Sequence, residues 1–216
     1  MSTSGYIIRA ELRPGAVAAI LANAASNDDG HALVWSLFEH LDKGDRRFLY
    51  REEGPGRYLV VSTVPPGDAG GVFHVEHKPY EPDFSVGDRL SFALRVNPAV
   101  AIREQGKRGR RTDAVMHARA QAASGEQRRD IDKDAVLEEW LRPRLMARGA
   151  DLQSMTVSGW TVRTARRPGQ GRHNLAVADI EGMLTVTDPA AFTPSLFAGY
   201  GKARAYGCGL LLVRRA

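Results

Sequence analysis

The sequence has little of what metal centres and disulfides are made from. It contains one cysteine, Cys208, among 216 residues, which excludes an internal disulfide and a zinc site built from several cysteines. His74 and His77 are close in sequence, but their odd spacing would place them on opposite faces of a strand. We therefore expect no bound metal and no cofactor, and Cys208 is best explained as a small buried apolar residue.

Long apolar runs are also missing. No stretch approaches the roughly 18 apolar residues that a membrane-spanning helix needs. The opening residues, MSTSGYIIRAEL, lack a basic stretch followed by an apolar core, so we expect no signal peptide. These two absences favour a cytoplasmic protein with no membrane partner.

The overall composition is that of a folded protein with a moderate excess of positive charge. Hydrophobic residues make up 43% and charged residues 25%, and the length allows one large domain or two of about 100 residues each. Lys and Arg exceed Asp and Glu by 30 to 25, and the isoelectric point is about 9.6. This balance points weakly to a polyanionic partner.

The positive charge is concentrated in two segments that also contain glycine, and in the second case proline. The segment 103–119 contains Arg103, Lys107, Arg108, Arg110, Arg111 and Arg119, and the segment 163–173 contains Arg163, Arg166, Arg167, Arg172 and His173. The second segment has no acidic residue at all. Clustered bases without local partners are typical of loops that bind phosphate, although a solvated surface loop is the alternative for each.

Hydrophobic periodicity and turn residues predict two similar halves. The first half has expected strands at 5–12, 47–53, 57–64 and near 73–80, with a helix at 27–42. The second has expected strands at 89–102 and 208–214, a hairpin of 152–163 with 172–186, and helices at 132–148 and 188–199. Each half approximates a βαββαβ unit, so we predict an α+β protein with two ferredoxin-like (RRM-like) domains, residues 1–88 and 89–216.

The segment 199–213, GYGKARAYGCGLLLV, combines four glycines with two cations. It is not a Walker A loop, because position 196 is leucine, and it is not a dinucleotide motif, because a strand follows it. Glycines allow unusual backbone angles and a close approach to the main chain. We expect Gly199 and Gly201 to let the main chain donate N–H groups to a phosphate, with Lys202 and Arg204 adding positive charge.

His31 lies in the first turn of the predicted helix 27–42, with Trp35 and Phe38 as helical neighbours. A helix N-terminus attracts anions, so a histidine there is suited to proton transfer beside a phosphate. From the residues alone, a structural or solvated histidine is the commoner outcome.

Three motifs together resemble those of the CRISPR-associated endoribonucleases of the CasE type, the repeat-processing subunit of type I-E Cascade. They are His31 followed by Trp35, Leu37 and Phe38; the stretch FALRVNP at 92–98 with Arg95, Asn97 and Pro98; and the glycine-rich signature from Gly199 through Leu211. The stretch Glu181 to Val186 also fits the family pattern. The resemblance covers essentially the whole chain.

The resemblance implies a tandem ferredoxin-like fold and a metal-independent endoribonuclease. Such an enzyme cleaves the CRISPR repeat hairpin of precursor crRNA, leaves a 2′,3′-cyclic phosphate and a 5′-hydroxyl, and stays bound to mature crRNA with other Cascade subunits in the prokaryotic cytoplasm. It implies that His31 is the catalytic residue, most simply as the base. The expected RNA-binding residues are Arg95, Arg103, Lys107, Arg108, Arg110, Arg111, Arg163, Arg166, Arg167, Arg172, His173, Gly199, Gly201, Lys202 and Arg204.

One position departs from the family pattern. A tyrosine often stands three residues before the histidine, and here that residue is Asp28, which could cap the helix. Lys202, Tyr200 and Tyr206 are the candidates for the missing proton donor. Two other functions remain: a non-catalytic RNA-binding subunit of the same complex, or a general single-strand RNA binder. The latter needs exposed aromatic residues, and only 7% of the chain is aromatic.

Overall fold

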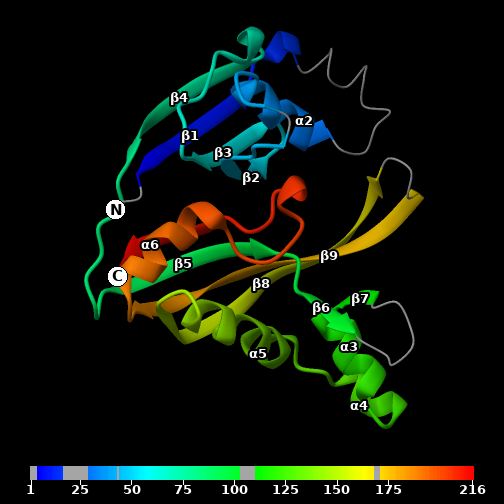
Figure 1. Ribbon diagram of the computed structural model, residues 1–216. Helices are drawn as coiled ribbons and strands as arrows, with labels where there is room; N and C mark the ends of the chain where they lie inside the picture. The colour runs from blue at the N-terminus through cyan, green and yellow to red at the C-terminus, as the bar shows by residue number, and fades with distance from the viewer. Residues whose placement is uncertain (1–3, 17–28, 43, 103–109, 168–170) are drawn as a thin grey trace.

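The computed structural model describes residues 4–16, 29–42, 44–102, 110–167 and 171–216. Two four-stranded antiparallel sheets dominate the molecule, one from each half of the chain (Figure 1). Among the described residues, no helix is long and apolar enough to cross a membrane.

The first sheet is built from strands in the order β2-β3-β1-β4. Its strands are β1 (Gly5–Leu12), β2 (Phe48–Gly54), β3 (Arg57–Ser62) and β4 (Phe73–Tyr80). Alternate residues face the helical layer, so Ile8 and Val60 are buried against Val34 and Phe38. This layer is α2 (Asp29–Trp35) continued by the 3₁₀ turn η1 (Ser36–Phe38), and a second 3₁₀ turn, η2 (Ala69–Gly71), precedes β4.

The helix of the first half is shorter than the predicted range 27–42, of which residues 27 and 28 lie outside the described part. Regular α-helix ends at Trp35, and the chain tightens into η1. The Ser36 hydroxyl donates to the Leu33 carbonyl oxygen at 2.7 Å. Such a local bond competes with the helical hydrogen-bond ladder, which favours an early helix end.

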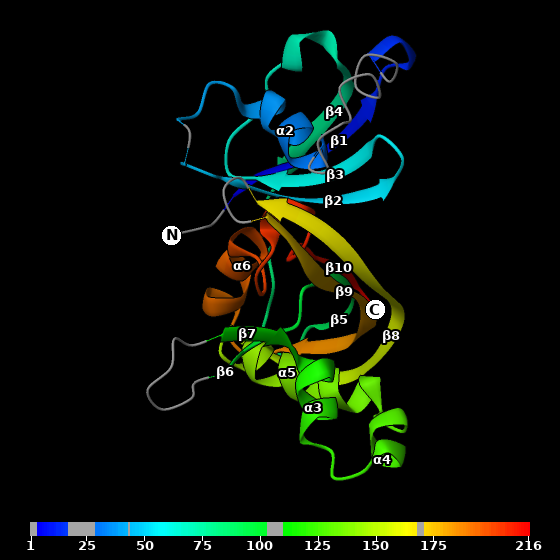
Figure 2. The ribbon, with the colours of Figure 1, turned by 90° about the vertical axis from the view of Figure 1, so that its right-hand side faces the viewer.

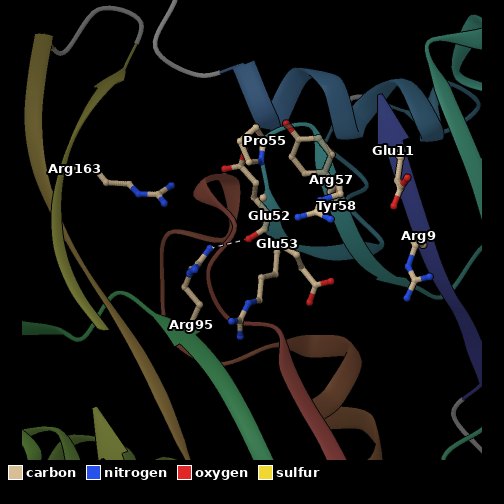
Figure 3. A pocket seen from close by; sticks show the side chains of 11 residues that line it. Arg9, Glu11, Glu52, Glu53, Pro55, Arg57, Tyr58, Arg95 and Arg163 are labelled. Carbon is tan, nitrogen blue, oxygen red and sulfur yellow. Dashed lines mark hydrogen bonds between the residues drawn. The ribbon is translucent and has the colours of Figure 1, made fainter. Parts of the chain in front are cut away.

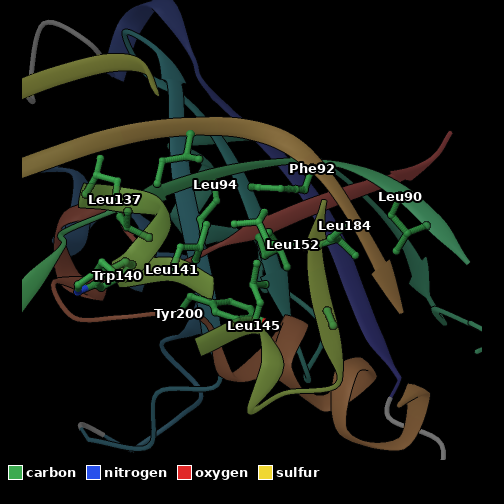
Figure 4. Close-up of a cluster of buried hydrophobic side chains, with 14 of the residues drawn as sticks. Leu90, Phe92, Leu94, Leu137, Trp140, Leu141, Leu145, Leu152, Leu184 and Tyr200 are labelled. Carbon is green, nitrogen blue, oxygen red and sulfur yellow. The ribbon is translucent and has the colours of Figure 1, made fainter. Parts of the chain in front are cut away.

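The second sheet repeats the same order, β10-β5-β9-β8. Its strands are β5 (Arg89–Val96), β8 (Ala150–Arg167), β9 (Gly171–Val186) and β10 (Leu211–Arg215). Helices α5 (Lys133–Met146) and α6 (Pro189–Ala198) contribute Leu141 and Phe192 to its core, which Figure 4 shows around Leu94. Leu137, Trp140, Leu141 and Leu145 of α5 are all buried in this core.

An insertion separates β5 from α5. It contains β6 (Ala99–Ile102), β7 (Arg110–Asp113), α3 (Ala114–Gln121) and α4 (Gly125–Arg129). The prediction of one strand over 89–102 was therefore wrong, because the chain breaks at Asn97 and Pro98. The Asn97 side chain donates to the Ala176 carbonyl oxygen of β9 at 2.7 Å, and Pro98 has no N–H with which to continue the ladder. The prediction of a loop through 119 was also wrong, since residues 110–119 form β7 and part of α3.

The two sheets meet through a small apolar contact. Leu49 and Val61 of the first sheet pack with Leu210 beside β10. The hairpin of β8 and β9 extends beyond its own sheet and curves toward the first sheet in both ribbon views (Figures 1 and 2). The shared strand order, with a helical layer on each sheet, confirms the predicted tandem ferredoxin-like fold.

Candidate active site

The last part of the chain before β10 folds back toward α2, the helix that carries His31 (Figure 1). The 3₁₀ turn η3 (Arg204–Tyr206) lies against α2. The Tyr50 hydroxyl of β2 donates to the Ala205 carbonyl oxygen at 2.6 Å. The glycine-rich segment therefore packs against α2 and β2, the elements that surround His31, although it follows β9 in sequence.

His31 is held by an aromatic neighbour one helical turn away. The Trp35 indole N–H donates to His31 Nε2 at 3.1 Å, and the Trp35 ring meets Phe48 edge-on at 5.1 Å. Since Nε2 accepts this bond, a neutral His31 carries its proton on Nδ1. His31 Nδ1 is buried and has no hydrogen-bond partner within the described chain. A substrate hydroxyl that gives its proton to Nε2 must first displace the indole.

A cavity of about 640 Å³ opens beside this histidine. Its lining is mostly aromatic and apolar, with three ionisable side chains. The residues that line it include His31, Trp35, Phe38, Glu39, Leu41 and Arg46. The cavity is therefore a space of substrate size in which a proton-transfer group and a cation lie together.

Arg46 reaches this cavity from the segment before β2. Its Nε donates to the Phe48 carbonyl oxygen at 3.1 Å, and its Nη2 donates to the Arg204 carbonyl oxygen at 2.8 Å. The guanidinium lies 4.9 Å from the centre of the Phe48 ring. Burial lowers the pKa of Arg46, Tyr50 partly offsets this, and Arg204 lowers it further. The prediction from sequence did not include Arg46, because it lies outside both basic segments.

The same surroundings keep His31 in its neutral form. Burial, and then the positive charge of Arg46, lower the pKa of His31 below its ordinary value of 6.5. His31 lies in the first turn of α2, as predicted. A neutral imidazole at pH 7 has the protonation state that a general base needs.

The glycine-rich segment has structural reasons for its glycines. Gly199 has φ of 73°, and a Cβ there would come within 2.8 Å of the Leu49 side chain. The Gly199 N–H donates to the Ser195 carbonyl oxygen at 2.9 Å, so the expectation that it donates to phosphate was wrong. Gly201 has φ of 74°, and a Cβ there would come within 3.2 Å of the Trp140 ring.

The three candidate proton donors differ in access. Tyr200 is 1% exposed, shares a hydrogen bond of 2.7 Å with the Ser195 hydroxyl, and lies in the core of the second sheet. Burial raises its pKa, so Tyr200 was a wrong candidate. Lys202 and Tyr206 line a second cavity, of about 580 Å³, together with Arg111.

A third space, of about 850 Å³, is a cleft between the two sheets (Figure 3). Arg163 enters it from β8, and Arg9 and Glu11 lie on the opposite side. Arg95, which was predicted to bind RNA, lines this cleft but makes its hydrogen bonds within the protein. Its Nε and Nη2 donate to the Asp179 carboxylate at 2.8 and 3.1 Å, and its Nη1 donates to the Glu52 carbonyl oxygen at 3.0 Å.

The remaining predicted RNA-binding residues are placed only in part. Arg103, Lys107 and Arg108 lie outside the described residues. Five others lie in strands, but their side chains are outside the description: Arg110 in β7, Arg166 and Arg167 in β8, and Arg172 and His173 in β9. Among those whose side chains are described, Arg111, Arg163, Lys202 and Arg204 are exposed.

The other histidine pair, His74 and His77, lies exposed on β4. His74 Nε2 lies 3.6 Å from a carboxylate oxygen of Glu76, and His77 meets the Tyr6 ring edge-on at 5.9 Å. Within the described part of the chain, no group of three or more His, Cys, Asp or Glu residues could hold a metal ion. Cys208 is fully buried, and burial raises the pKa of its thiol to about 12.

Two sheets of identical strand order place the chain in the class of tandem ferredoxin-like proteins. A family model described as CRISPR associated protein matches residues 6–215. The match spans nearly the whole chain, so the protein belongs to this family.

Three relatives agree with this assignment. The CRISPR system Cascade subunit CasE of Escherichia coli is 27% identical over 202 residues, which cover 89% of this chain and 94% of the relative. The CRISPR-associated endoribonuclease Cse3 of Thermus thermophilus is 28% identical over 219 residues, covering 96% and 99%. A structure of Thermus thermophilus Cse3, bound to an RNA that represents a pre-cleavage complex, superposes with a TM-score of 0.75 at 25% identity and covers 98% and 99%.

Proposed function

We propose that this protein is a metal-independent endoribonuclease that cleaves CRISPR repeat hairpins in precursor crRNA. We further propose that it stays bound to mature crRNA as a subunit of a type I-E Cascade complex in the cytoplasm. The observation that carries the proposal is the cavity in which a neutral His31 faces the cation Arg46. Nearly full-length similarity to Cse3 and CasE supports the same conclusion.

In the proposed reaction the RNA supplies its own nucleophile. His31 takes the proton of the 2′-hydroxyl, the 2′-oxygen bonds to phosphorus, and the bond from phosphorus to the 5′-oxygen breaks. The leaving 5′-oxygen takes a proton from Lys202, Tyr206 or a solvent water, and protonated His31 then returns its proton to the solvent or to the donor, which restores the starting state. The products are a 2′,3′-cyclic phosphate and a free 5′-hydroxyl, so the enzyme contributes alignment, proton transfer and charge stabilisation. DNA lacks the attacking hydroxyl and should not be cut.

We propose that the hairpin of β8 and β9 holds the RNA stem. Its backbone register makes Arg166 and Arg172 cross-strand partners, and the exposed Arg163 lies on the same β8 strand. A paired RNA helix presents mainly phosphates and shape to a protein, which suits arginine. Exposed Lys202 and Arg204 would extend this basic surface toward His31.

We place the boundary between the two proposed domains at residues 88 and 89. Strand β4 ends at Tyr80 and β5 begins at Arg89. Each sheet draws all its strands from one side of this boundary, which supports the division.

The test is single-turnover cleavage of the host's own CRISPR-repeat hairpin RNA in excess EDTA. We expect one cut with a cyclic phosphate end, and we expect His31→Ala to bind the RNA but cut it roughly 10²–10⁴-fold more slowly. RNA with a 2′-deoxy substitution at the cut site is the control and should remain intact.

A non-catalytic RNA-binding subunit is the second candidate, because Asp28 stands where the family often has tyrosine. Tight binding of the hairpin by the wild type without any cleavage would establish that function instead.

A further inference from the structure

Arg46 has no close acidic partner among the described residues, although the Glu39 carboxylate lines the same cavity. The charged and titratable groups that act on Arg46 are Tyr50 and a second cation, Arg204. Arg204 is in turn affected by the nearby positive charge of Arg148. Within the described chain, no carboxylate lies within 4 Å of the Arg46 guanidinium. Grouped cations that are partly removed from water repel one another, and an anion bound between them would relieve this cost.

The guanidinium of Arg46 is fixed in place before any ligand binds. Two protein carbonyl oxygens accept from its Nε and Nη2, and the faces of Phe48 and Tyr50 lie 4.9 and 5.9 Å from its central carbon. These bonds use two of the five N–H donors of the group. No other described residue accepts a hydrogen bond from it. The remaining donors belong to a rigid group that lines the same cavity as His31.

We propose that Arg46 is a catalytic residue that binds a non-bridging oxygen of the phosphate being cut. This inference rests on the proposed function. As the 2′-oxygen attacks, negative charge grows on the non-bridging oxygens, and a donor already held in position stabilises that charge without reorganising. Arginine suits this task because its planar fork matches phosphate geometry and keeps its charge.

The experiment compares Arg46→Met with Arg47→Met in single-turnover cleavage of the repeat hairpin in EDTA. Methionine keeps much of the packing against Phe48 but has no donor. Arg47 is the matched control, because it is the next residue, is exposed, and pairs with Asp45 at 2.8 Å outside the cavity. Each protein is tested on three RNAs. One has the natural phosphate at the cleavage site, and in each of the other two a different non-bridging oxygen of that phosphate is replaced by sulfur. Affinity is measured on 2′-deoxy RNA.

We expect Arg46→Met to cut the oxygen substrate roughly 10²-fold more slowly, with a smaller loss of affinity, and Arg47→Met to match the wild type. One phosphorothioate should slow the wild type and cause no further slowing in Arg46→Met, because both changes remove the same contact. The proposal would be overturned if the phosphorothioate slowed Arg46→Met as much as it slows the wild type. It would also be overturned if Arg46→Met cut the oxygen substrate at the wild-type rate.

The experiment also distinguishes failure of the proposed function, and misfolding of the variant, from failure of the role of Arg46. A wild type that does not cut at all refutes the proposed function, and the role of Arg46 with it. If Arg46→Met does not fold, Arg46→Lys takes its place, since lysine keeps the charge and the aliphatic stem. We then expect a reduced rate and a weakened phosphorothioate effect, and unchanged values of both would refute the role of the guanidinium.

Discussion

Arg46 and Arg95 are both partly buried arginines, and they differ in what faces them. Arg95 is paired with the Asp179 carboxylate through two hydrogen bonds and reaches across to Glu52 of the other sheet. Among the described residues, Arg46 donates hydrogen bonds to carbonyl oxygens, lies against aromatic rings and has the cation Arg204 as a neighbour. The first arrangement joins two parts of one molecule, whereas the second is left to be completed by a ligand. An arginine without a nearby carboxylate therefore identifies the site better than the number of basic residues in a segment does.

The largest expected effect in this comparison is on the stability of the protein when Arg95 is replaced. Replacing Arg95 with methionine removes the main partner of Asp179 and the contact with Glu52. Because both charged side chains are mostly buried, at 16% and 29% exposure, we expect a loss of about 1–3 kcal/mol in the free energy of unfolding. Urea denaturation measures this loss.

The control for Arg95→Met is its cleavage rate under conditions where it is folded. That rate should stay within about tenfold of the wild type, because Arg95 does not line the His31 cavity. A stable variant that cannot cut would mean that the cleft, and not the cavity, holds the reacting phosphate.

The next effect concerns the pH dependence of cleavage. The charged groups that line the cavity with His31 are Glu39 and Arg46. The hydroxyls of Tyr50 and Tyr58 lie beside the preceding residue, Gly30, and Arg204 contacts Arg46 through its carbonyl oxygen. Since burial and Arg46 lower the pKa of His31, the neutral base persists to a pH below 6.5. We expect a flat rate from pH 7 to 8 and a fall only as pH drops through the lowered pKa of His31.

Trp35→Phe tests the cause of that profile. The indole N–H stabilises neutral His31, so its loss should raise the pKa of His31 and move the acid limb upward by less than about one pH unit. Phenylalanine keeps the contact with Phe48, so the fold should survive. The limb is measured below saturating RNA, where the pKa of the free enzyme governs it. A limb that stays in place, or moves downward, would show that the Trp35 bond does not lower the pKa of His31.

The smallest effect is expected on the hairpin. Arg163→Ala should weaken RNA binding and reduce the slope of log affinity against log salt by about one. Filter binding at several salt concentrations measures the slope, with Arg9→Ala as a control from the opposite side of the cleft. An unchanged slope for Arg163→Ala would remove this part of β8 from the RNA interface.

Local patterns in the sequence predicted the fold well and the site only in part. Alternating apolar residues identified nearly every strand, because burial on one face of a sheet is a local, period-two property. The break at Pro98 was missed because the flanking residues are apolar on both sides, although proline could have signalled it. The residue His31 was found through its motif. The pairings of Arg95 with Asp179 and of Arg46 with Arg204 span 84 and 158 positions, and no local pattern reports them.

The contact between the segment before β2 and the turn η3 also orders events during synthesis. Arg204 is translated 158 residues after Arg46, whose Nη2 donates to its carbonyl oxygen. The first sheet can form while the ribosome is still working, but the η3 carbonyl oxygen that holds the Arg46 guanidinium beside His31 is not yet in place. A nascent chain therefore carries its histidine without a finished pocket, and competence to cut arrives only when the glycine-rich segment has left the exit tunnel and docked.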